Sequence, residues 1–388
     1  MSDTLEERIK RLKDGALKEI QKKHGQESII LGEGQFKNVE IVCSSGSLSL
    51  DNALGVGGFP KGRIIEIVGN ESCGKSSVTL INIAECQRSG KVCAYLDVEQ
   101  AFDPEYAKKL GVNVTNLILS QPSTMEDTFD IIHSLVKSKE VDYIVVDSTN
   151  AMLSKRIFEG EVGDANMGRS ALLMSQELPK VNVECANTGC TIVFISQVRS
   201  KIGVMFGSPE VYGVGNAMKF FASIRIKVTK SDQVKDDTMG QEAIDINASV
   251  FKNKVAPPYK KAKFTLLTGK LDSDSNEQYG IDTYKEIIDF AVDYGIIGKG
   301  GAWYKYTING NEERWQGAPN VIKYFKDNEN DFQELKSKVI EKINQEKNKN
   351  KPVEGSFADV KEEVKKERKP REVKEVVVEE TKENEPVV

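Results

Sequence analysis

Five short apolar runs, each followed by a helix-like segment, restrict the folds open to this chain more than any other feature. The runs are rich in β-branched residues and lie between residues 63 and 197: RIIEIVG, KVCAYLDVE, NLILSQ, DYIVVDS and CTIVFISQ. Strands that alternate with helices in this way indicate βαβ units and a sheet whose strands are mostly parallel. We therefore expect an α/β fold with a mostly parallel, twisted sheet as the main domain, over residues 37–273.

The segments outside this range predict three smaller parts. Residues 1–36 place apolar side chains at helical spacing among charged ones, which predicts an N-terminal amphipathic helix that needs a partner surface. Residues 274–345 contain both tryptophans, and their changed spacing indicates a small α/β C-terminal domain. Residues 346–388 are rich in charge, nearly devoid of aromatics and broken by prolines, so we expect a disordered tail.

The composition argues against several classes of protein. A net charge of -5 is unsuited to coating duplex DNA by bulk positive charge, although it permits a confined basic strip. No stretch approaches the roughly 20 apolar residues of a membrane span, and the N-terminus lacks an apolar signal core. The six cysteines have no C-x-x-C spacing and lie far from the two histidines, which argues against a zinc site. We expect a cytoplasmic protein with reduced thiols and no membrane partner.

The glycine-rich stretch GNESCGKSS lies between the first apolar run and a helical segment, and it matches the phosphate-loop pattern G-x-x-x-x-G-K-[ST]. In such a loop backbone N–H groups surround the phosphates, the lysine reaches the β and γ oxygens, and the following serine ligates Mg²⁺. An ordinary glycine-rich turn is the alternative, which the flanking strand and helix disfavour. The predicted ATP and Mg²⁺ site comprises Gly69, Asn70, Glu71, Ser72, Cys73, Gly74, Lys75, Ser76 and Ser77.

Two carboxylates end later apolar runs and should reach the same edge of the sheet, where open α/β sheets bind their ligands. Asp147 ends DYIVVD and can hold the metal through its water shell. Glu99 ends CAYLDVE and can orient and deprotonate the attacking water. For Glu99, a helix-capping or solvated carboxylate is the alternative.

The segment after the last apolar run joins a polar strand end to an apolar loop rich in glycine. Gln197 ends the run, close to where a γ-phosphate would lie, and can pass the state of that phosphate into the loop. Arg199 and Lys201 can contact DNA phosphates, while Met205 and Phe206 can stack on bases or wedge between them. A loop that covers the protein's own core or a neighbouring subunit is the alternative.

Several motifs, taken in their order, resemble those of the bacterial RecA recombinases over roughly residues 5–345. They include GNESCGKSS, AYLDVEQAFDPEYAKKLGV, VDYIVVDS, EGEVGDANMG, SQVRSKIGVMFGSPE, GNAMKFFAS, KNKVAPPYKKAKF and GAWY. The resemblance implies a RecA-like ATPase core that forms ATP-dependent filaments on single-stranded DNA. Such filaments pair the strand with homologous duplex DNA, exchange strands in recombination and repair, and in this family also stimulate a self-cleaving repressor.

The resemblance also assigns roles to single residues in the nucleotide site. Lys75 and Ser76 match the phosphate and Mg²⁺ ligands, Glu99 the catalytic glutamate and Asp147 the metal carboxylate that acts through water. Gln197 matches the glutamine that couples the γ-phosphate to the second DNA loop. The remaining matches are Asp103 and Tyr106 for adenine, and Lys219, Lys252 and Lys254 for the ATP of the adjacent protomer, which Lys219 and Phe220 also join.

Two segments match the DNA loops of the family, residues 159–168 and residues 198–215. Leu172 and Pro179 stand where the family carries basic residues, and Pro179 should kink or end its helix. Arg169 lies three positions before Leu172 on the same helical face, and we hypothesise that it supplies the missing charge. The predicted DNA-binding residues are Met167, Gly168, Arg169, Arg199, Lys201, Met205, Phe206, Gly215 and Asn216.

Two other functions are compatible with a phosphate loop. A ring-forming helicase or translocase would use ATP to move along a strand, and the order of the motifs favours a filament over this alternative. A small-molecule P-loop kinase would leave the methionine and phenylalanine of the second loop without a role. In the family that the chain resembles, the C-terminal tail is typically acidic and restrains the uptake of duplex DNA. Here the tail mixes acidic and basic residues, so the resemblance implies a weakened restraint.

Overall fold

A computed structural model describes residues 3–25, 28–29, 39–160, 168–200, 210–212, 216–231, 243–271 and 277–349 of the chain. The tail expected at residues 346–388 lies outside the described residues from residue 350 onward. No helix of the described part is long and apolar enough to cross a membrane.

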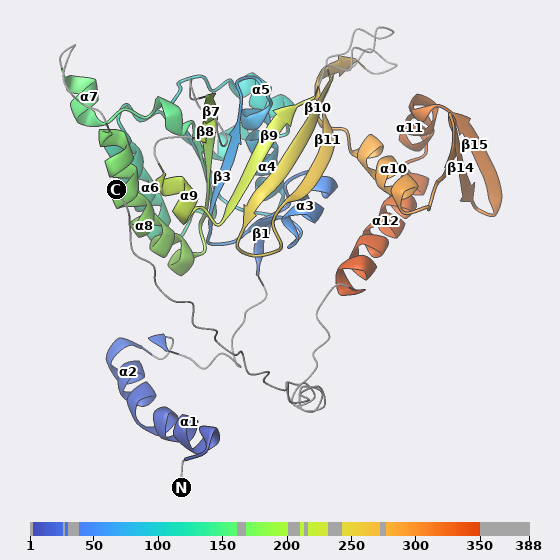
Figure 1. Cartoon of the computed structure of the whole chain (residues 1–388). Coiled ribbons are helices and arrows are strands. Elements are labelled where there is room, and N and C mark those ends of the chain that lie inside the picture. The colour runs from blue at the N-terminus through green and yellow to red at the C-terminus, as the bar shows by residue number, and fades with distance from the viewer. Residues whose placement is uncertain are drawn as a thin grey trace, which may run out of the picture. The chain divides into compact units, whose positions relative to one another are not determined.

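A ten-stranded sheet forms the centre of the protein (Figure 1). Its order is β12-β11-β10-β9-β3-β7-β6-β4-β5, and β8 pairs with β7 beside this path. Strands β9, β3, β7, β6, β4 and β5 run parallel to one another, whereas the other pairings are antiparallel. The bounds are β3 Ile64–Gly69, β4 Cys93–Asp97, β5 Leu117–Ser120, β6 Tyr143–Asp147, β7 Thr191–Ser200, β8 Glu210–Tyr212, β9 Ile224–Lys230, β10 Ala243–Asn253, β11 Lys260–Leu271 and β12 Glu277–Ile281.

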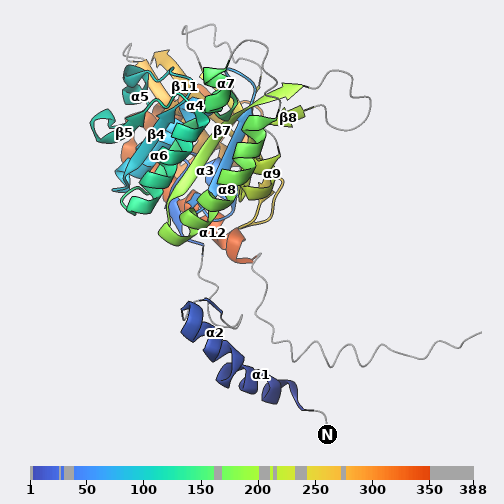
Figure 2. The same cartoon turned by 90° about the vertical axis from the view of Figure 1, so that its left-hand side faces the viewer.

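Helices cover both faces of this sheet, so its central strands are buried and mostly apolar. Every residue of β3, β4 and β6 is buried. One apolar cluster joins the sheet to α3, α4 and α5, and a second joins it to α6, α8 and α9; Figure 2 shows α6 and α8 across the second face. The bounds are α3 Leu48–Leu54, α4 Lys75–Arg88, α5 Pro104–Lys109, α6 Met125–Ser138, α7 Lys155–Glu159, α8 Arg169–Thr188 and α9 Ala217–Phe221, with 3₁₀ turns at Val114–Asn116 and Thr149–Ala151.

The five apolar runs correspond to β3, β4, β5, β6 and β7, which confirms the predicted α/β fold. Pro179 does not end its helix, because α8 continues through it to Thr188. The helix buries Met174 and Leu178 on one side of the proline and Val181 on the other, and this burial outweighs the one backbone hydrogen bond that proline removes.

The N-terminal segment forms two helices, α1 (Leu5–Asp14) and α2 (Ala16–His24), which meet at Gly15. A capping box begins α1, in which the Thr4 side chain accepts from the Glu7 N–H and the Glu7 side chain accepts from the Thr4 N–H. Neither helix buries a residue. The predicted apolar stripe is therefore exposed in the single chain. A two-stranded sheet, β1 (Ile41–Cys43) with β2 (Phe59–Pro60), follows.

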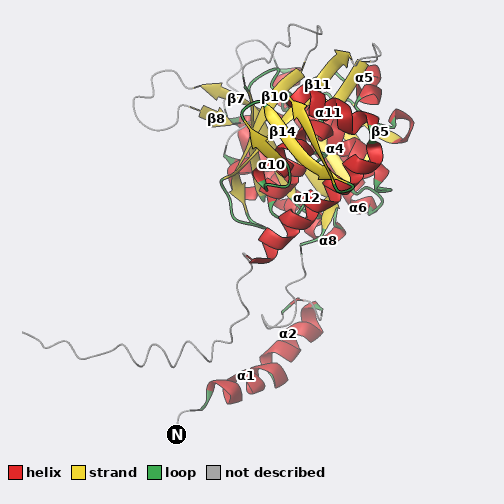
Figure 3. Ribbon diagram, turned by 90° about the vertical axis from the view of Figure 1, so that its right-hand side faces the viewer, coloured by secondary structure: helices red, strands yellow, loops and turns green. Residues whose placement is uncertain are grey.

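The C-terminal part contains a small three-stranded antiparallel sheet and three helices, seen from the side in Figure 3. Trp315 packs against Tyr324 and Phe325 at its centre. Strand β12, which the sequence assigns to this part, pairs with β11 of the large sheet. The bounds are α10 Thr283–Asp293, β13 Gly298–Gly300, β14 Trp303–Ile308, β15 Asn311–Gln316, α11 Ala318–Asp327 and α12 Glu329–Lys349.

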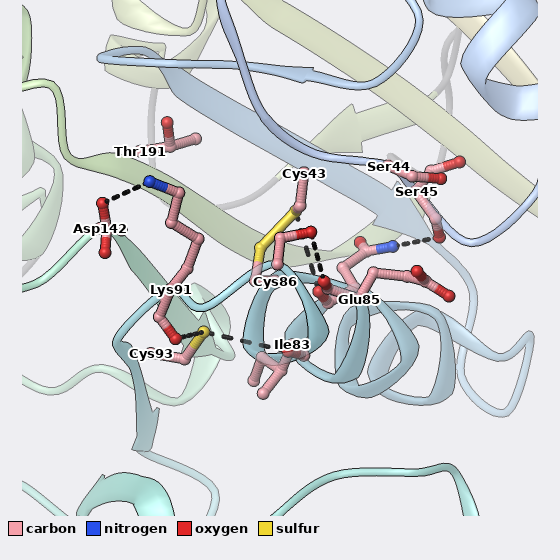
Figure 4. The surroundings of a disulfide bond; sticks show 12 residues. Cys43, Ser44, Ser45, Ile83, Glu85, Cys86, Lys91, Cys93, Asp142 and Thr191 are labelled. Atoms are coloured by element: carbon pink, nitrogen blue, oxygen red, sulfur yellow. Dashed lines mark hydrogen bonds and ion pairs between the residues drawn. A yellow bond between two sulfur atoms is a disulfide. The ribbon is translucent and has the colours of Figure 1, made fainter.

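A disulfide joins Cys43 of β1 to Cys86 of α4 (Figure 4), which corrects the expectation that all thiols are reduced. The two cysteines are 43 positions apart in sequence, and their Cα atoms are 5.0 Å apart. Both are buried in the cluster that joins α3 and α4 to the sheet. The bond therefore ties the segment before the phosphate loop to the helix that follows it.

We predict that reducing this disulfide lowers the free energy of unfolding by up to about 4 kcal/mol, because a cross-link over a loop of this length restricts the unfolded chain. Urea unfolding with and without a thiol reductant measures the difference. A Cys43→Ala variant should unfold at the same urea concentration in both conditions. If alkylation of the unfolded, unreduced protein modifies all six cysteines, the disulfide does not form in solution.

Candidate functional site

The ends of four adjacent parallel strands bring the predicted catalytic residues to one edge of the sheet. The strand order β3-β7-β6-β4 makes these ends neighbours. In register, Gly69 of β3 lies opposite Gln197 of β7, and Asp97 of β4 lies opposite Asp147 of β6. The carboxyl edge of an open parallel sheet is where such folds bind ligands.

The phosphate loop connects β3 to α4, and its backbone needs two of its glycines. A Cβ atom on Gly69 would lie 2.5 Å from the Val228 carbonyl oxygen, and Gly74 has a φ of +88°. Gly74 precedes α4 without a side-chain cap, so the first N–H groups of the helix remain available to an anion. Lys75 is buried, and its Nζ donates to the Asn70 carbonyl at 2.6 Å across the loop.

The other loop residues divide into exposed and packed ones. Glu71 is exposed, and Ser72 adopts a φ of +53°. Cys73 is buried with its Sγ 3.5 Å from the Val228 carbonyl oxygen, and this burial raises the pKa of its thiol. Ser77 shares a hydrogen bond of 2.8 Å with the Tyr106 hydroxyl. The loop therefore presents backbone groups and Ser76, rather than the cysteine, to a ligand.

Asp147 is a buried carboxylate at the end of β6. Its Oδ2 accepts from the Ser76 hydroxyl and from the Tyr95 hydroxyl, each at 2.6 Å. Burial raises the pKa of Asp147, while the two hydrogen bonds lower it. Ser76 lies in the first turn of α4, so its hydrogen bond to Asp147 connects the phosphate loop to β6.

Glu99 and Gln197 meet in front of the sheet. Glu99 Oε1 accepts from the Ser148 hydroxyl at 2.7 Å and from Gln197 Nε2 at 3.1 Å. The backbone N–H of Gln197 donates to Asn150 Oδ1 at 2.7 Å. Two side-chain donors thus orient Glu99. These contacts argue against the alternatives that Glu99 caps a helix or is a freely solvated carboxylate.

Three polar residues that sequence reasoning missed hold this arrangement. Asp97 is buried and accepts from the N–H groups of Ala101 and Phe102, which fixes the turn that carries Glu99. Ser148 and Asn150 position Glu99 and Gln197. The sequence signal for these two was their place directly after Asp147. No comparable signal marked Asp97 beyond its end position in an apolar run.

Asp103 and Tyr106 lie beside this centre. Asp103 caps α5, where its Oδ1 accepts from the Glu105 N–H at 2.8 Å and the Tyr106 N–H at 3.2 Å. The Tyr106 ring packs edge-on against Tyr279 with centroids 6.1 Å apart. Both line a cavity of 110 Å³, together with Ser76, Leu80, Tyr95, Asp97, Glu99, Ala101, Phe102 and Asp147.

A second group gathers the residues assigned to the adjacent protomer's ATP. Lys252 Nζ donates to the Lys219 carbonyl at 2.6 Å and to the Phe220 carbonyl at 3.2 Å, and Lys254 Nζ donates to the Phe220 carbonyl at 3.3 Å. The Phe220 side chain is 64% exposed. The pKa of Lys252 is lowered to about 8, mainly by burial and to a smaller extent by repulsion from Lys254 and Arg225.

The described residues include only the margins of the two segments predicted to be DNA loops. Gly168, with a φ of +84°, precedes α8, and Arg169 is exposed in the first turn of that helix, three residues before the exposed Leu172. Strand β8 pairs with the end of β7, Val198 to Ser200, which gives the second loop a hairpin base that the sequence did not predict. Asn216 is exposed directly before α9. Outside the described residues lie Met167, Lys201, Met205, Phe206, Gly215 and the side chain of Arg199.

Known proteins match most of the chain. The RecA N-terminal domain model matches residues 10–271, and the RecA C-terminal domain model matches residues 285–344. Protein RecA of Acinetobacter baumannii is 46% identical over 331 residues, 84% of this chain and 90% of the relative, and Protein RecA of Acinetobacter baylyi is 45% identical over the same shares. A crystal structure of the RadB recombinase aligns with a TM-score of 0.44 and 22% identity, over 61% of this chain and 99% of that chain.

We predict that Ser148→Ala lowers the maximal rate of ATP hydrolysis about tenfold, because Glu99 loses one of its two orienting donors. This is less than the roughly 10²- to 10⁴-fold that a general base itself contributes. Steady-state kinetics and equilibrium binding of nucleotide measure the effect, and nucleotide affinity should stay unchanged.

Ser154→Ala is the matched control for this prediction. Ser154 is equally buried, but its hydroxyl has no hydrogen-bond partner among the described residues. Its removal should therefore leave the rate unchanged. Equal rates for Ser148→Ala and the unaltered protein would show that the Ser148 hydrogen bond does not orient Glu99 for hydrolysis.

Proposed function

The chain belongs to the RecA family and is a DNA-dependent ATPase of homologous recombination and DNA repair, and we propose that it binds single-stranded DNA in a filament whose affinity for the strand depends on bound ATP. The observation that carries the proposal is the Gln197 to Glu99 hydrogen bond. It links the residue proposed to activate water to the strand that leads into the second DNA loop.

The family uses ATP with magnesium, and the residues of this chain fit that pair. Lys75 and the uncapped N–H groups of α4 suit the phosphates, and Ser76 offers a hydroxyl oxygen to the metal. Asp147, next to Ser76, can accept from a metal-bound water. Mg²⁺, when bound, would offset negative charge that develops on the phosphates. Asp103 and Tyr106, on the wall of the adjoining cavity, are proposed to contact adenine.

Hydrolysis is proposed to begin with Glu99, which accepts a proton from the attacking water. The Ser148 donor keeps one Glu99 oxygen engaged, so that the carboxylate has a defined orientation. Gln197 shares that same oxygen. A γ-phosphate that draws the Gln197 amide toward itself would break this contact and move the end of β7, from which the second loop starts.

Filament formation is proposed to use the surface formed by the exposed Lys219, Phe220 and Lys254 and the half-buried Lys252. The three ammonium groups, carried by adjacent segments, suit the phosphates of a neighbouring subunit's ATP, and the exposed Phe220 ring suits burial against that subunit. The stripe on α1 and α2, exposed in the single chain, is proposed to pack on an adjacent copy. Each protomer would then complete the nucleotide site of the next.

The DNA partners follow from the family. Single-stranded DNA is proposed to bind at the two loops, with Arg169 as a phosphate contact at the start of α8. Homologous duplex DNA is the proposed partner for pairing and strand exchange, and a self-cleaving repressor is a further proposed partner of the filament. The combination of both RecA domain matches speaks against a ring-forming translocase or a small-molecule kinase.

We predict that a slowly hydrolysed ATP analogue tightens binding of single-stranded DNA at least tenfold over the nucleotide-free protein, because both loops respond to the phosphate. Fluorescence anisotropy of a labelled oligonucleotide measures the affinities. Gln197→Ala should reduce the ratio when the analogue is present at a saturating concentration. Electron microscopy of the same complexes distinguishes a filament from a ring, and equal affinity in the two nucleotide states would refute the proposal.

We predict that filament assembly weakens as the pH rises from 7 to 9. The pKa of Lys252 is lowered to about 8, so its charge is present below that pH and is lost above it. At one pH unit above the pKa only about one molecule in ten carries the charge. Lys252→Arg keeps its charge and should assemble equally across this range.

Light scattering with single-stranded DNA and the ATP analogue measures this pH dependence. Lys305→Arg, an exposed lysine of β14, is the control and should behave as the unaltered protein. An unchanged pH dependence in Lys252→Arg would show that the charge of Lys252 does not limit assembly.

A further inference from the structure

A tyrosine hydroxyl lies behind the nucleotide site and has no role in the function described so far. Tyr95, on β4, is 3% exposed, and its Oη donates to Oδ2 of Asp147 at 2.6 Å. The Ser76 hydroxyl donates to the same oxygen, also at 2.6 Å. One carboxylate oxygen of Asp147 therefore accepts hydrogen bonds from two hydroxyl groups, which lie on two different elements.

The Tyr95 hydroxyl is held rigidly. Its strand is buried at every position and pairs with β6 in a register that places Tyr95 beside Val145. Its ring packs against Phe102 with centroids 5.2 Å apart. A tyrosine has two side-chain torsions, and packing on a central strand leaves neither free. The donor is thus fixed in space before any ligand binds.

The two hydroxyl donors, Ser76 and Tyr95, differ in whether they also bind the metal. Ser76 is expected to give an oxygen lone pair to the metal while its O–H donates a hydrogen bond to Asp147. Tyr95 has no such second role, because its buried hydroxyl donates only to Asp147 among the described residues. Among the described residues no protein group donates to the other oxygen, Oδ1. That oxygen is left to accept from a water of the metal shell.

We propose that Tyr95 is a positioning residue for Asp147, whose hydroxyl fixes the carboxylate so that its second oxygen can receive a metal-bound water, and that it thereby tightens metal binding in the nucleotide complex. This inference rests on the proposed function, because it takes Ser76 and Asp147 as the metal site. Groups that orient a metal-binding side chain typically affect metal affinity by about 10- to 100-fold. Since a water separates Asp147 from the metal, the lower end applies.

The test measures metal binding directly. Mn²⁺ serves as the probe, read by electron paramagnetic resonance, with ADP present and without DNA. Tyr95→Phe keeps the ring and removes the donor, and the Mn²⁺ dissociation constant should rise about tenfold. The affinity for ADP without metal should be unchanged, because Tyr95 acts only through Asp147.

Tyr143→Phe is the matched control. Tyr143 is fully buried on the neighbouring strand β6, and its hydroxyl has no hydrogen-bond partner among the described residues. Removing that oxygen should leave the Mn²⁺ dissociation constant unchanged. An equal rise in both variants would mean that any lost buried hydroxyl loosens the site, which would overturn the assignment to Tyr95.

A double-mutant cycle separates this inference from the function on which it rests. Asp147→Asn should weaken Mn²⁺ binding, and adding Tyr95→Phe should then change nothing further. If Asp147→Asn weakens binding but Tyr95→Phe alone stays within twofold of the unaltered protein, the inference fails and the proposed metal site stands. If Asp147→Asn has no effect, the proposed metal site itself fails.

A second substitution covers the case in which Tyr95→Phe does not fold. Site-specific 3-fluorotyrosine at position 95 keeps the ring and the hydroxyl but makes the phenol more acidic, so it donates a stronger hydrogen bond to the carboxylate. The Mn²⁺ dissociation constant should fall. An unchanged or higher constant would overturn the inference.

Discussion

A charged carboxylate kept away from water, at the end of a central parallel strand, is the constraint on which the rest of this structure depends. Burial disfavours the charge of Asp147 and raises its pKa, while two hydrogen bonds and the charge of Lys75 act in the opposite direction. The two donors it accepts come from the first turn of the helix after the phosphate loop and from the neighbouring strand β4. Stabilising one charge therefore fixes three elements against each other, and these are the elements that carry the proposed nucleotide site.

Further hydrogen bonds at the same edge of the sheet connect Asp147 to β4, β7 and β8. The Asp147 backbone carbonyl accepts from the N–H groups of Val98 and Glu99, so the turn after β4 is attached to the end of β6. Glu99 then meets Gln197 at the end of β7, and β7 continues into the hairpin with β8. A change at the proposed phosphate site would thus have a short, hydrogen-bonded route to the segment proposed as the second DNA loop. Each contact along this route is a side-chain or backbone hydrogen bond of 2.7 to 3.2 Å.

Much of the fold and of the site could be predicted because the chemistry is local in sequence. The phosphate loop is one stretch from Gly69 to Ser77, and the apolar runs that became β3 to β7 are each continuous. Prediction failed where the deciding contact joins distant residues. Cys43 and Cys86 are 43 positions apart and pair only because α4 packs beside β1. Pro179 was expected to kink or end its helix, but the helix continues to Thr188. The helix propensity of proline is a local property, whereas the burial of the turns on both sides of it depends on tertiary packing.

The sequence by itself determined the class of fold, the phosphate loop and the family, since a lysine and serine after a glycine-rich turn, and apolar runs of strand length, carry their meaning within a few residues. Only the tertiary structure decided which polar groups support them. In the sequence, Tyr95 is one residue of an apolar run, and its hydrogen bond to Asp147 exists only because β4 pairs with β6. Asp97 is likewise an ordinary strand end in the sequence, and its role in holding the turn that carries Glu99 is visible only in the folded chain. The reason is physical: a hydrogen bond between strands depends on register and burial, and both are properties of the assembled sheet rather than of any segment within it.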